Sequence, residues 1–335
     1  MARAPVASPV TVQYMRDWGK HAHGSPLYAT LVDVVSADAE LMRVINRIEH
    51  QLPPNLLFAA VQYLLMEGAD DDLSRFYPSL TTDPDPPEAV GPHFRRFVLE
   101  HEEQIVEIGN TRYTQTNECR RCIALLPMVM MAPFDSFHLV DVGASAGLNL
   151  AVDRYGYRYD VAQWHTDASL VLEAEWRGAP VALREVEVVG RTGLDLNPLD
   201  PYDVSARRWL DALIWPEHHE RRARLRSALE LVSTLEMEMV GGDATDTLPV
   251  CLDNLAPGVP VVMMSSFTLA QFSPAQRDRL ETVLSDARAH RPVHSISMEA
   301  LEKSDDWAQL VVDDGSGTRI VGQAHPHGEW VEIYP

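Results

Sequence analysis

Apolar residues recur at helical spacing through the first part of the chain. In segments 27–35 and 41–48 they lie three or four positions apart, and a longer apolar run spans 56–66. Residues at this spacing share one face of an α-helix, so the pattern predicts amphipathic helices that pack on a common core. The same pattern returns at 93–107, with no strand signal of comparable strength before it. We therefore expect a helical cap domain over residues 1–135.

From residue 137 onward the period of the apolar positions changes. Short apolar runs, bounded by glycine, proline or charged residues, alternate with longer amphipathic stretches. The predicted strands are 137–142, 185–189, 194–196, 239–240, 259–265 and 293–298, and the predicted helices start at 148 or span 204–213, 217–235 and 274–290. Strands that alternate with helices indicate βαβ units and a parallel sheet. Segments 309–313, 318–321 and 330–333, with a glycine turn between the first two, predict a closing antiparallel hairpin.

The charge balance bears on possible partners. The chain has 28 Lys and Arg residues against 49 Asp and Glu residues, a formal net charge of −21. A general nucleic-acid binder draws most of its affinity from cationic contacts to phosphates, so this composition argues against one. The one basic cluster is Arg221, Arg222, Arg224 and Arg226. Because acidic residues flank it in a helical stretch, we expect a solvated helix face there.

Cysteine usage and hydropathy set the expected compartment. Cys119 and Cys122 form a single C-x-x-C pair and Cys251 stands alone, so we expect buried packing residues and no metal site. The N-terminal residues lack the apolar core of a secretory signal. No apolar stretch approaches the roughly 20 residues that a membrane span requires. We expect a cytoplasmic protein with no membrane partner.

The segment Asp141-Val-Gly-Ala-Ser-Ala-Gly147 joins a predicted strand to a predicted helix. A strand, a glycine-rich turn and a helix together present backbone N–H groups and the positive helix end to a ligand. Gly143 permits a tight turn, and Gly147 permits close approach of the helix to the strand. Three classes of protein use such a loop: dinucleotide-binding enzymes, α/β-hydrolases and S-adenosylmethionine-dependent methyltransferases.

Two of these interpretations meet obstacles. A dinucleotide fingerprint would carry glycine at position 145, where this chain has serine. The pattern Gly143-x-Ser145-x-Gly147 is that of a hydrolase nucleophile elbow. The other triad members would come from Asp195 or Asp243 and from His294 or His325. Against a hydrolase stand the carboxylate of Asp141 at the strand end and the long helical segment in place of the strands that normally precede an elbow. A serine hydrolase stays the third functional alternative.

An S-adenosylmethionine site explains the loop best. Its acidic-x-Gly-x-x-x-Gly pattern is matched by Asp141, Gly143 and Gly147, and a cofactor without phosphates tolerates a serine within the loop. Carboxylates also end the next two predicted strands, with Asp195 placed for the ribose hydroxyls and Asp243 for the adenine amino group. The carboxyl ends of parallel strands meet at one edge of a sheet, where α/β folds bind ligands. The other expected cofactor contacts are Ala144, Ser145, Asn149, Asn197 and Ala244.

The spacing between the loop and the ribose carboxylate is unusual. Such a carboxylate commonly lies about 20 residues past the glycine loop. Asp195 follows Gly143 by 52 positions (195 minus 143). Residues 157–191 must then form an insertion, and their apolar alternation suggests a hairpin. Asp160 has the better spacing, but no convincing buried strand precedes it.

Several motifs resemble those of a bacterial family known as domain of unknown function 2332. They are Gln115-Thr-Asn-Glu-Cys-Arg120, Val140-Asp-Val-Gly-Ala-Ser-Ala-Gly-Leu-Asn-Leu150, Gly193-Leu-Asp-Leu-Asn-Pro-Leu-Asp200, Trp209-Leu, Trp215-Pro-Glu, Gly242-Asp243 and His325-Pro-His-Gly-Glu-Trp330. These motifs span nearly the whole chain. The resemblance implies a methyltransferase-like fold with a helical N-terminal part, and it carries over no established reaction.

The resemblance draws attention to the segment before the helix that leads into the loop strand. We expect Asn117, Glu118 and Arg121 to fold over the cofactor pocket. The alternative is an ordinary helix N-terminus, with Thr116 or Asn117 as the cap. His325 and His327 likewise have two interpretations, as residues that face the substrate or as parts of a turn.

The predicted fold is α/β: a Rossmann-like class I methyltransferase fold over residues 136–335, with a mostly parallel sheet and an antiparallel C-terminal hairpin, plus the N-terminal helical domain. The predicted function is S-adenosylmethionine-dependent methylation of a small molecule. The alternative is a regulatory module that binds the cofactor without turnover. Ser265, Ser266 and Glu299 follow two strand ends and are the candidate catalytic residues, with ordinary loop polarity as the alternative.

Overall fold

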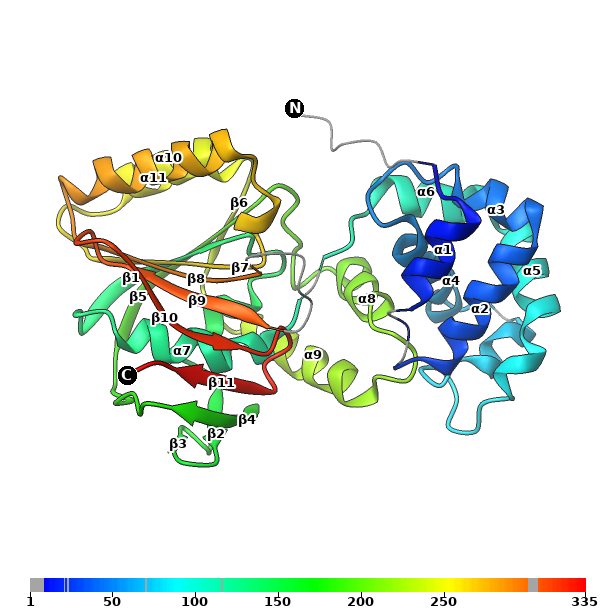
Figure 1. The fold of residues 1–335 in the computed structure, drawn as a ribbon, viewed down its shortest axis with the longest axis horizontal. Helices are drawn as coiled ribbons and strands as arrows, with labels where there is room; N and C mark the ends of the chain where they lie inside the picture. Colours follow the sequence, from blue (N-terminus) through cyan, green and yellow to red (C-terminus); the bar gives the residue numbers. More distant parts are fainter. Residues whose placement is uncertain (1–8, 21, 23, 70, 116, 301–306) are drawn as a thin grey trace. The chain divides into compact units, whose positions relative to one another are not determined.

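Two compact units share the chain. The computed structural model describes residues 9–20, 22, 24–69, 71–115, 117–300 and 307–335. The helical unit comprises residues 1–116 with 203–223, and the sheet unit comprises 117–202 with 224–335. Figure 1 shows the chain coloured along its sequence. The single boundary expected after residue 135 is replaced by this discontinuous division, because helix α7 packs on the sheet and helix α8 packs on α4.

The helical unit is built around one helix that is buried on all sides. Residues 56–65 of α4 are all buried, as expected for a helix without a polar face. The helices are α1 (Val12–Gly19), α2 (Pro26–Ala37), α3 (Ala39–Ile45), α4 (Pro53–Glu67), α5 (Gly91–Glu100), α6 (Glu102–Thr111) and α8 (Val204–Ala212), with 3-10 turns η1 (Asp72–Phe76) and η2 (Pro87–Ala89). The helical prediction for this region is confirmed, although the pattern over 93–107 corresponds to two helices that meet at His101.

The expectation of a solvated arginine face was wrong for two of its residues. Arg222 is 3% exposed and forms an ion pair with Asp211, which precedes it along the chain by eleven residues. Arg224 is largely buried, and its Nε donates to Glu118 at 3.1 Å. Both lie on α9 (His219–Val232). Their partners come from outside that helix, so its own charge pattern does not reveal them.

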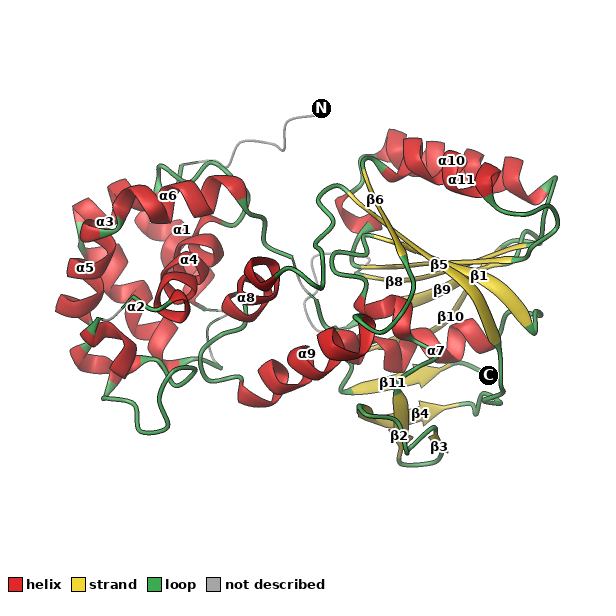
Figure 2. Ribbon diagram, turned by 180° about the vertical axis from the view of Figure 1, so that it is seen from behind, coloured by secondary structure: helices red, strands yellow, loops and turns green. Residues whose placement is uncertain are grey.

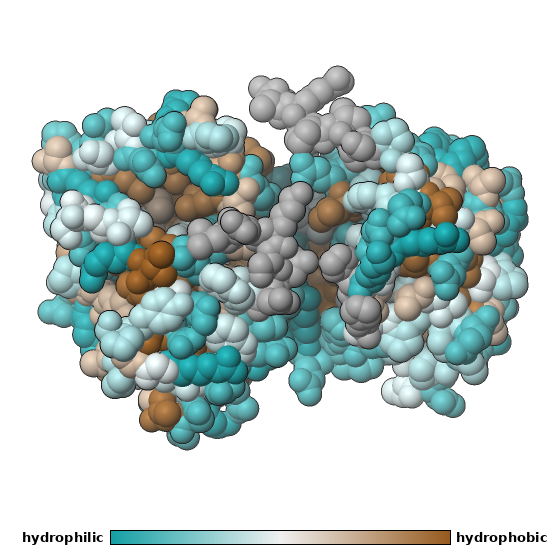
Figure 3. Space-filling model, in the orientation of Figure 1, coloured by the Kyte–Doolittle hydropathy of each residue, from teal (hydrophilic) through white to brown (hydrophobic). Residues whose placement is uncertain are grey.

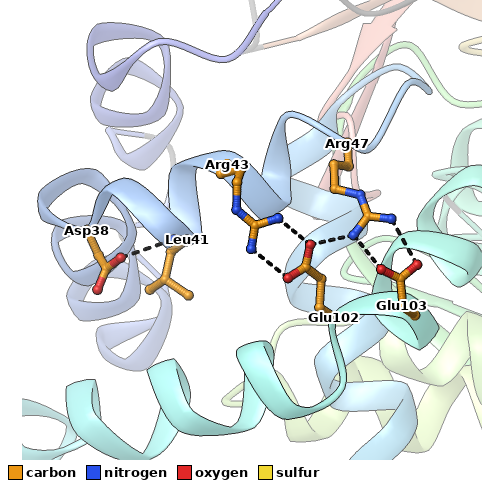
Figure 4. Close-up of polar contacts among 6 residues, drawn as sticks. All are labelled: Asp38, Leu41, Arg43, Arg47, Glu102 and Glu103. Atoms are coloured by element: carbon orange, nitrogen blue, oxygen red, sulfur yellow. Dashed lines mark hydrogen bonds and ion pairs between the residues drawn. The ribbon is translucent and has the colours of Figure 1, made fainter.

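Helices α3 and α6 are joined by a cluster of ion pairs (Figure 4). Arg43 Nη1 donates to Glu102 at 2.5 Å, and Arg47 pairs with Glu102 and, at 2.8 Å, with Glu103. Asp38 begins α3 as its N-cap by accepting from the N–H of Leu41 at 3.1 Å. Hydrogen bonding by Arg43 and Arg47 lowers the pKa of Glu102 to about 2 despite its partial burial.

Replacing Glu102 by glutamine is expected to lower the melting temperature at pH 7 by about 1–3 °C. The folded pKa of Glu102 lies below its ordinary value, so its stabilisation exists above about pH 4.5 and disappears as the pH falls toward 2. Thermal melts of wild type and variant should therefore differ at pH 7 and converge as the pH approaches 2. Glu107→Gln, an exposed change on the same helix, is the control. A difference that stays constant with pH would contradict this account.

The sheet unit contains an eleven-stranded, mostly parallel sheet in the order β3-β2-β4-β11-β10-β9-β8-β7-β1-β5-β6. The strands are β1 (Ser136–Val142), β2 (Gly156–Tyr159), β3 (Gln163–Trp164), β4 (Val171–Gly178), β5 (Glu187–Asp195), β6 (Glu238–Gly241), β7 (Val261–Ser266), β8 (Val293–Glu299), β9 (Ala308–Asp313), β10 (Thr318–Ala324) and β11 (Trp330–Ile333). Strands β6, β5, β1, β7 and β8 are mutually parallel neighbours. Numbered by their order in the chain, these five stand as 3-2-1-4-5.

The strand predictions are largely confirmed, with three differences. Segments 185–189 and 194–196 belong to a single strand, β5. The insertion 157–191 contains the hairpin β2–β3, and its β4 pairs with β11, so the insertion extends the sheet at its far edge. The helix expected from residue 148 was wrong, because only the 3-10 turn η4 (Leu148–Ala151) forms there. The closing strands β9, β10 and β11 are antiparallel, as expected.

Helices cover both faces of the five parallel strands. Figure 2 shows α10 (Ala244–Asn254) and α11 (Pro274–Arg288) on one side of the sheet and α7 (Cys122–Met130) on the other. Val140 and Val142 of β1 belong to the core beneath α10 and α11. Because side chains alternate along a strand, Asp141 points to the other face, the one that α7 covers. We call this the α7 face.

The surface of the molecule is predominantly polar. Hydrophilic residues cover most of the view in Figure 3, and the hydrophobic residues that show there form separate small areas. Exposed apolar side chains such as Val161, Val189 and Ile320 are scattered singly over the sequence. In the part of the chain that the structure describes, no helix is both long and apolar enough to cross a lipid bilayer.

Candidate functional site

The glycine loop after β1 has the tight turn that the sequence predicts. Gly143 has φ of 84°, Ser145 of 52° and Gly147 of 76°, so three residues occupy the left-handed region. A Cβ atom at Gly143 would overlap the hydroxyl of Thr268, which lies in the loop after β7. Glycine is therefore required at 143 both by its backbone angle and by the close approach of a neighbouring loop.

The backbone N–H groups of this loop are all used within the protein. Those of residues 143 and 144 donate to the carbonyl of Leu194, and that of 147 donates to the carbonyl of 144. The N–H of Ser145 donates to Asp195 Oδ2 at 2.8 Å, and that of residue 146 donates to Asn117 Oδ1 at 3.3 Å. We expected N–H groups and a helix end directed at a ligand, and the structure shows neither. The loop therefore offers no cradle for a phosphate.

In place of the helix that we expected after the loop, side chains at the start of β2 and from β5 bind the carbonyls of this segment. The hydroxyl of Tyr155 donates to the carbonyl of Leu148 at 2.8 Å, and that of Tyr157 donates to the carbonyl of Val152 at 2.5 Å. Arg191 donates to the carbonyl of residue 150 and forms a buried ion pair with Asp153. These bonds satisfy carbonyls that a helix would otherwise have paired. The alternation of buried tyrosines at 155, 157 and 159 was the signal for a strand.

Asp141 is the most unusual group at this edge of the sheet. Its side chain is 1% exposed, and neither carboxylate oxygen has a hydrogen-bond partner among the described residues. Burial and the nearby charge of Asp195 raise its pKa to about 7, and Asn149 and Arg121 only partly oppose the shift. A buried polar group without a partner costs free energy, so such groups in folded proteins call for an explanation.

Asp195 lies beside Asp141 on the same face. Asp141 pairs with Gly193 in the β1–β5 register, which places Asp195 two residues further toward the strand end. Its Oδ1 accepts from the N–H of Asn197 at 2.8 Å, while Oδ2 holds the N–H of Ser145. The half-buried carboxylate thus tethers two loops at once.

Two residues near Asp195 were missed by the sequence analysis. A Cβ atom at Gly193 would lie 2.6 Å from Met239 Sδ and 2.8 Å from Ala144 Cβ, so the loop packs directly on bare backbone there. Leu196, beside the carboxylate, is 79% exposed. A large apolar side chain next to a predicted ribose carboxylate was a signal available in the sequence.

Asp243 ends β6 as predicted, but both of its oxygens are engaged by the protein. Asp243 is the N-cap of α10, and Ala244 is the first residue of that helix. Oδ1 of Asp243 accepts from the N–H of Thr245 at 2.9 Å. Its Oδ2 accepts from Gln276 Nε2 at 2.8 Å. These bonds give Asp243 a structural role in beginning the helix.

The three candidate catalytic residues divide between the two faces of the sheet. Side chains alternate along a strand, so Ser265 and Glu299 lie on the same face as the core residues beneath α10 and α11. Ser265 Oγ donates to Glu299 at 3.2 Å. Ser266 lies on the α7 face, as Asp141 does, and is 7% exposed. Its hydroxyl has no hydrogen-bond partner among the described residues. Of the three candidate catalytic residues, only Ser266 therefore lies on the α7 face with Asp141.

Glu299 anchors the loop after β7. Its carboxylate accepts from the N–H groups of residues 268, 269 and 270 at 3.1–3.2 Å. Burial raises the pKa of Glu299, and these bonds partly oppose the shift. Three convergent backbone donors mark a structural anchor more than a free general base.

Replacing Glu299 by glutamine is expected to destabilise the sheet unit by about 2 kcal/mol, because an amide NH₂ would face buried N–H donors. Urea unfolding at pH 7 measures the change. Glu281→Gln, an exposed change on α11, is the control. Unaltered stability of Glu299→Gln would show that the anchor is unimportant and would return Glu299 to the catalytic candidates.

The segment before α7 reaches the glycine loop, as the resemblance suggested. Asn117 Nδ2 donates to Ser145 Oγ at 2.5 Å, so one amide bridges two residues of the loop. Glu118 caps the 3-10 turn η3 (Cys119–Arg121). Arg121 donates to the carbonyl of Pro326 at 3.0 Å and stacks on Phe267 at 4.3 Å from the ring centroid. Thr116 lies outside the described residues.

The C-terminal histidines form part of a turn. The N–H of His327 donates to Nδ1 of His325 at 3.2 Å, and His325 lies 3.9 Å from Glu329. Through Pro326 this turn contacts Arg121. The turn is thus a neighbour of the segment that bridges the loop.

Comparison with known proteins places the chain in a family. The profile of a family described as "Uncharacterized protein conserved in bacteria (DUF2332)" matches residues 13–333. The chain belongs to this family. The match covers both units, so DUF2332 comprises the helical unit together with the sheet unit. None of the curated proteins compared with the chain matches it.

The geometry of this DUF2332 protein argues against a serine hydrolase. The hydroxyl of Ser145 is held by Asn117, and no histidine of the described chain hydrogen-bonds to it. His294 begins β8, whereas Ser145 follows the end of β1. The two strands are both parallel to β7, so these residues lie at opposite edges of the sheet. A nucleophile elbow requires a base within hydrogen-bond reach.

Proposed function

We propose that this DUF2332 protein binds S-adenosylmethionine on the α7 face, at the ends of β1 and β5, and uses it to methylate a small molecule. The observation that carries the proposal is the buried carboxylate of Asp141, neither oxygen of which has a hydrogen-bond partner among the described residues. The order 3-2-1-4-5 of the parallel strands, closed by antiparallel strands, is the arrangement expected of a class I methyltransferase. The proposed cofactor supplies an activated methyl group on a sulfonium centre.

The residues present fit such a ligand. Asp141 offers a desolvated carboxylate to the ligand's ammonium group, which would supply the missing hydrogen bonds. Asp195 accepts from two backbone N–H groups and lies on the same face as Asp141, and we assign the ribose hydroxyls to its carboxylate. Leu196 offers an exposed apolar surface to the base beside the ribose. A loop whose N–H groups are all engaged fits a ligand without phosphates.

We assign the positioning of the methyl acceptor to Ser266. Its hydroxyl is buried on the same face as Asp141 and has no hydrogen-bond partner among the described residues. Ser266 ends β7, the strand next to β1. Methyl transfer depends mainly on positioning of the acceptor, and a buried hydroxyl donor positions a polar group. Ser265 and Glu299 are on the other face and take no part in this proposal.

A regulatory module that binds the same ligand without turnover is the second candidate. It is favoured by the position of Ser265 and Glu299, because two of the three candidate catalytic residues lie on the opposite face of the sheet from Asp141. Incubation with methyl-labelled S-adenosylmethionine and a bacterial small-molecule extract separates the two. Transfer of label to a small molecule supports the enzyme, and binding without transfer supports the module.

Calorimetric titration with S-adenosylmethionine and S-adenosylhomocysteine tests the proposal. We expect micromolar binding to wild type and about 10- to 100-fold weaker binding to Asp195→Asn, because the variant loses charged acceptor positions. Asp200→Asn is the matched control, an exposed change on the same segment that should leave the affinity unaltered. Absence of binding to well-folded wild type would refute the proposed function.

A further inference from the structure

We infer that Asp141 is a neutral carboxylic acid in the ligand-free protein and that a cationic ligand enters this site by replacing its proton. The identity of the ligand rests on the proposed function. The protonation of Asp141 rests on the packing around it and holds for any cation that the site accepts.

The surroundings of Asp141 leave its charge uncompensated. It lies within β1, where its register partners are Gly193 on β5 and Met264 on β7, neither of which offers a polar side chain. Among the described residues neither oxygen has a hydrogen-bond partner, and Asp141 is only 1% exposed. A carboxylate so placed becomes neutral unless a cation accompanies it.

The groups that face Asp141 do not supply that cation. Asp195, from β5, is a second acid, and Asn149, from η4, is neutral. Cys122, from α7, is buried with its thiol pKa raised well above the usual value by burial. Arg121, from η3, is the one cation among the described residues that lowers the pKa of Asp141. Its contacts include the carbonyl of Pro326 and the ring of Phe267, and it forms no hydrogen bond with either oxygen of Asp141.

The charge balance predicts proton release on binding. The ligand's positive group takes the place of the proton, and the proton passes to the buffer. With a pKa of about 7 for Asp141, its carboxyl should give up nearly one proton on binding at pH 6, about half a proton at pH 7 and little at pH 8. At pH 8 the ligand's α-amino group, with an ordinary pKa of about 8, takes up a proton on binding, so the net release should turn into an uptake. Affinity should fall about tenfold for each pH unit below 6, because the proton then competes with the ligand.

Titration calorimetry in paired buffers of different ionisation enthalpy measures this release. S-adenosylmethionine is titrated at pH 6, 7 and 8, and the dependence of the heat on the buffer gives the number of protons. We expect the decline with pH stated above. Tight binding at pH 6 with no proton released would overturn the inference while leaving the proposed function intact.

A second measurement needs no ligand. Infrared difference spectra of the ligand-free protein between pH 5 and pH 9 should show a protonated-carboxyl band that titrates near pH 7 and is missing in Asp141→Asn. An identical spectrum in wild type and variant would overturn the inference whether or not S-adenosylmethionine binds. A band that titrates as expected, in a protein that binds no S-adenosylmethionine, would keep the inference and remove the proposed ligand.

Discussion

Asp141→Asn is expected to abolish binding of S-adenosylmethionine while it stabilises the ligand-free protein at pH 8 by about 2–4 kcal/mol. The folded pKa of Asp141 is raised from 3.8 to about 7, so wild type loses stability as the pH rises between these values and keeps the loss above them. Asparagine has the same shape and no charge to bury. It also offers no negative charge to a cation, so the gain in stability and the loss of binding have one cause.

Urea unfolding at pH 5 and pH 8, followed by titration with the ligand, measures both effects. The stability difference between Asp141→Asn and wild type should be larger at pH 8 than at pH 5. Asp253→Asn, an exposed change in the last turn of α10, should change neither stability nor binding. If Asp141→Asn destabilises the protein at pH 8, the carboxylate has a structural role, and the central observation of the site loses its meaning.

Gly143→Ala is expected to destabilise the sheet unit by about 3 kcal/mol or more and to abolish ligand binding. Its φ of 84° is unfavourable for any side chain, and the added Cβ would overlap the Thr268 hydroxyl. Relief would require the loops after β1 and β7 to separate. Those loops directly follow the strands that carry Asp141 and Ser266 of the proposed site.

Two matched variants separate the causes of that loss. Gly258→Ala has a similar positive φ of 76° with open space around it, so it should cost only about 1–2 kcal/mol. Adding Thr268→Ala to Gly143→Ala should recover part of the stability, because it removes the overlapping hydroxyl. Equal costs for Gly143→Ala and Gly258→Ala in thermal or urea unfolding would show that the loops are not in close contact.

The sequence predicted the parallel strands and the glycine loop because both depend on local patterns. Short apolar runs that stop at glycine mark buried strands, and the runs that became β1, β7 and β8 were found within two residues of their ends. The acids at the ends of β1 and β5 followed from topology, since parallel strands end at one edge. These features need no knowledge of contacts between distant segments.

The helix expected from residue 148 does not form because the residues that follow its first turn have the alternation of a strand. Leu148 to Val152 is apolar enough for a first helical turn, but the tyrosines at 155, 157 and 159 alternate as a strand does. Their hydroxyls bind carbonyls of the preceding turn, which removes the need for helical pairing. A longer window would have favoured the strand.

Other features depend on partners that are distant in sequence. The burial of Arg222 requires Asp211, and the tie between Asn117 and Ser145 joins segments 28 residues apart. The face of Ser265 and Ser266 was also hidden, since every residue of β7 is buried and the strand shows no polar alternation. A strand covered on both faces gives no signal of which residue faces a ligand.

A crystal structure of the protein with S-adenosylhomocysteine tests the central claim most directly. We predict ligand density on the α7 face, with the ammonium group within hydrogen-bond distance of Asp141 and the ribose hydroxyls within reach of Asp195. Density elsewhere, or an unaltered Asp141 in crystals soaked at millimolar ligand, would contradict the account.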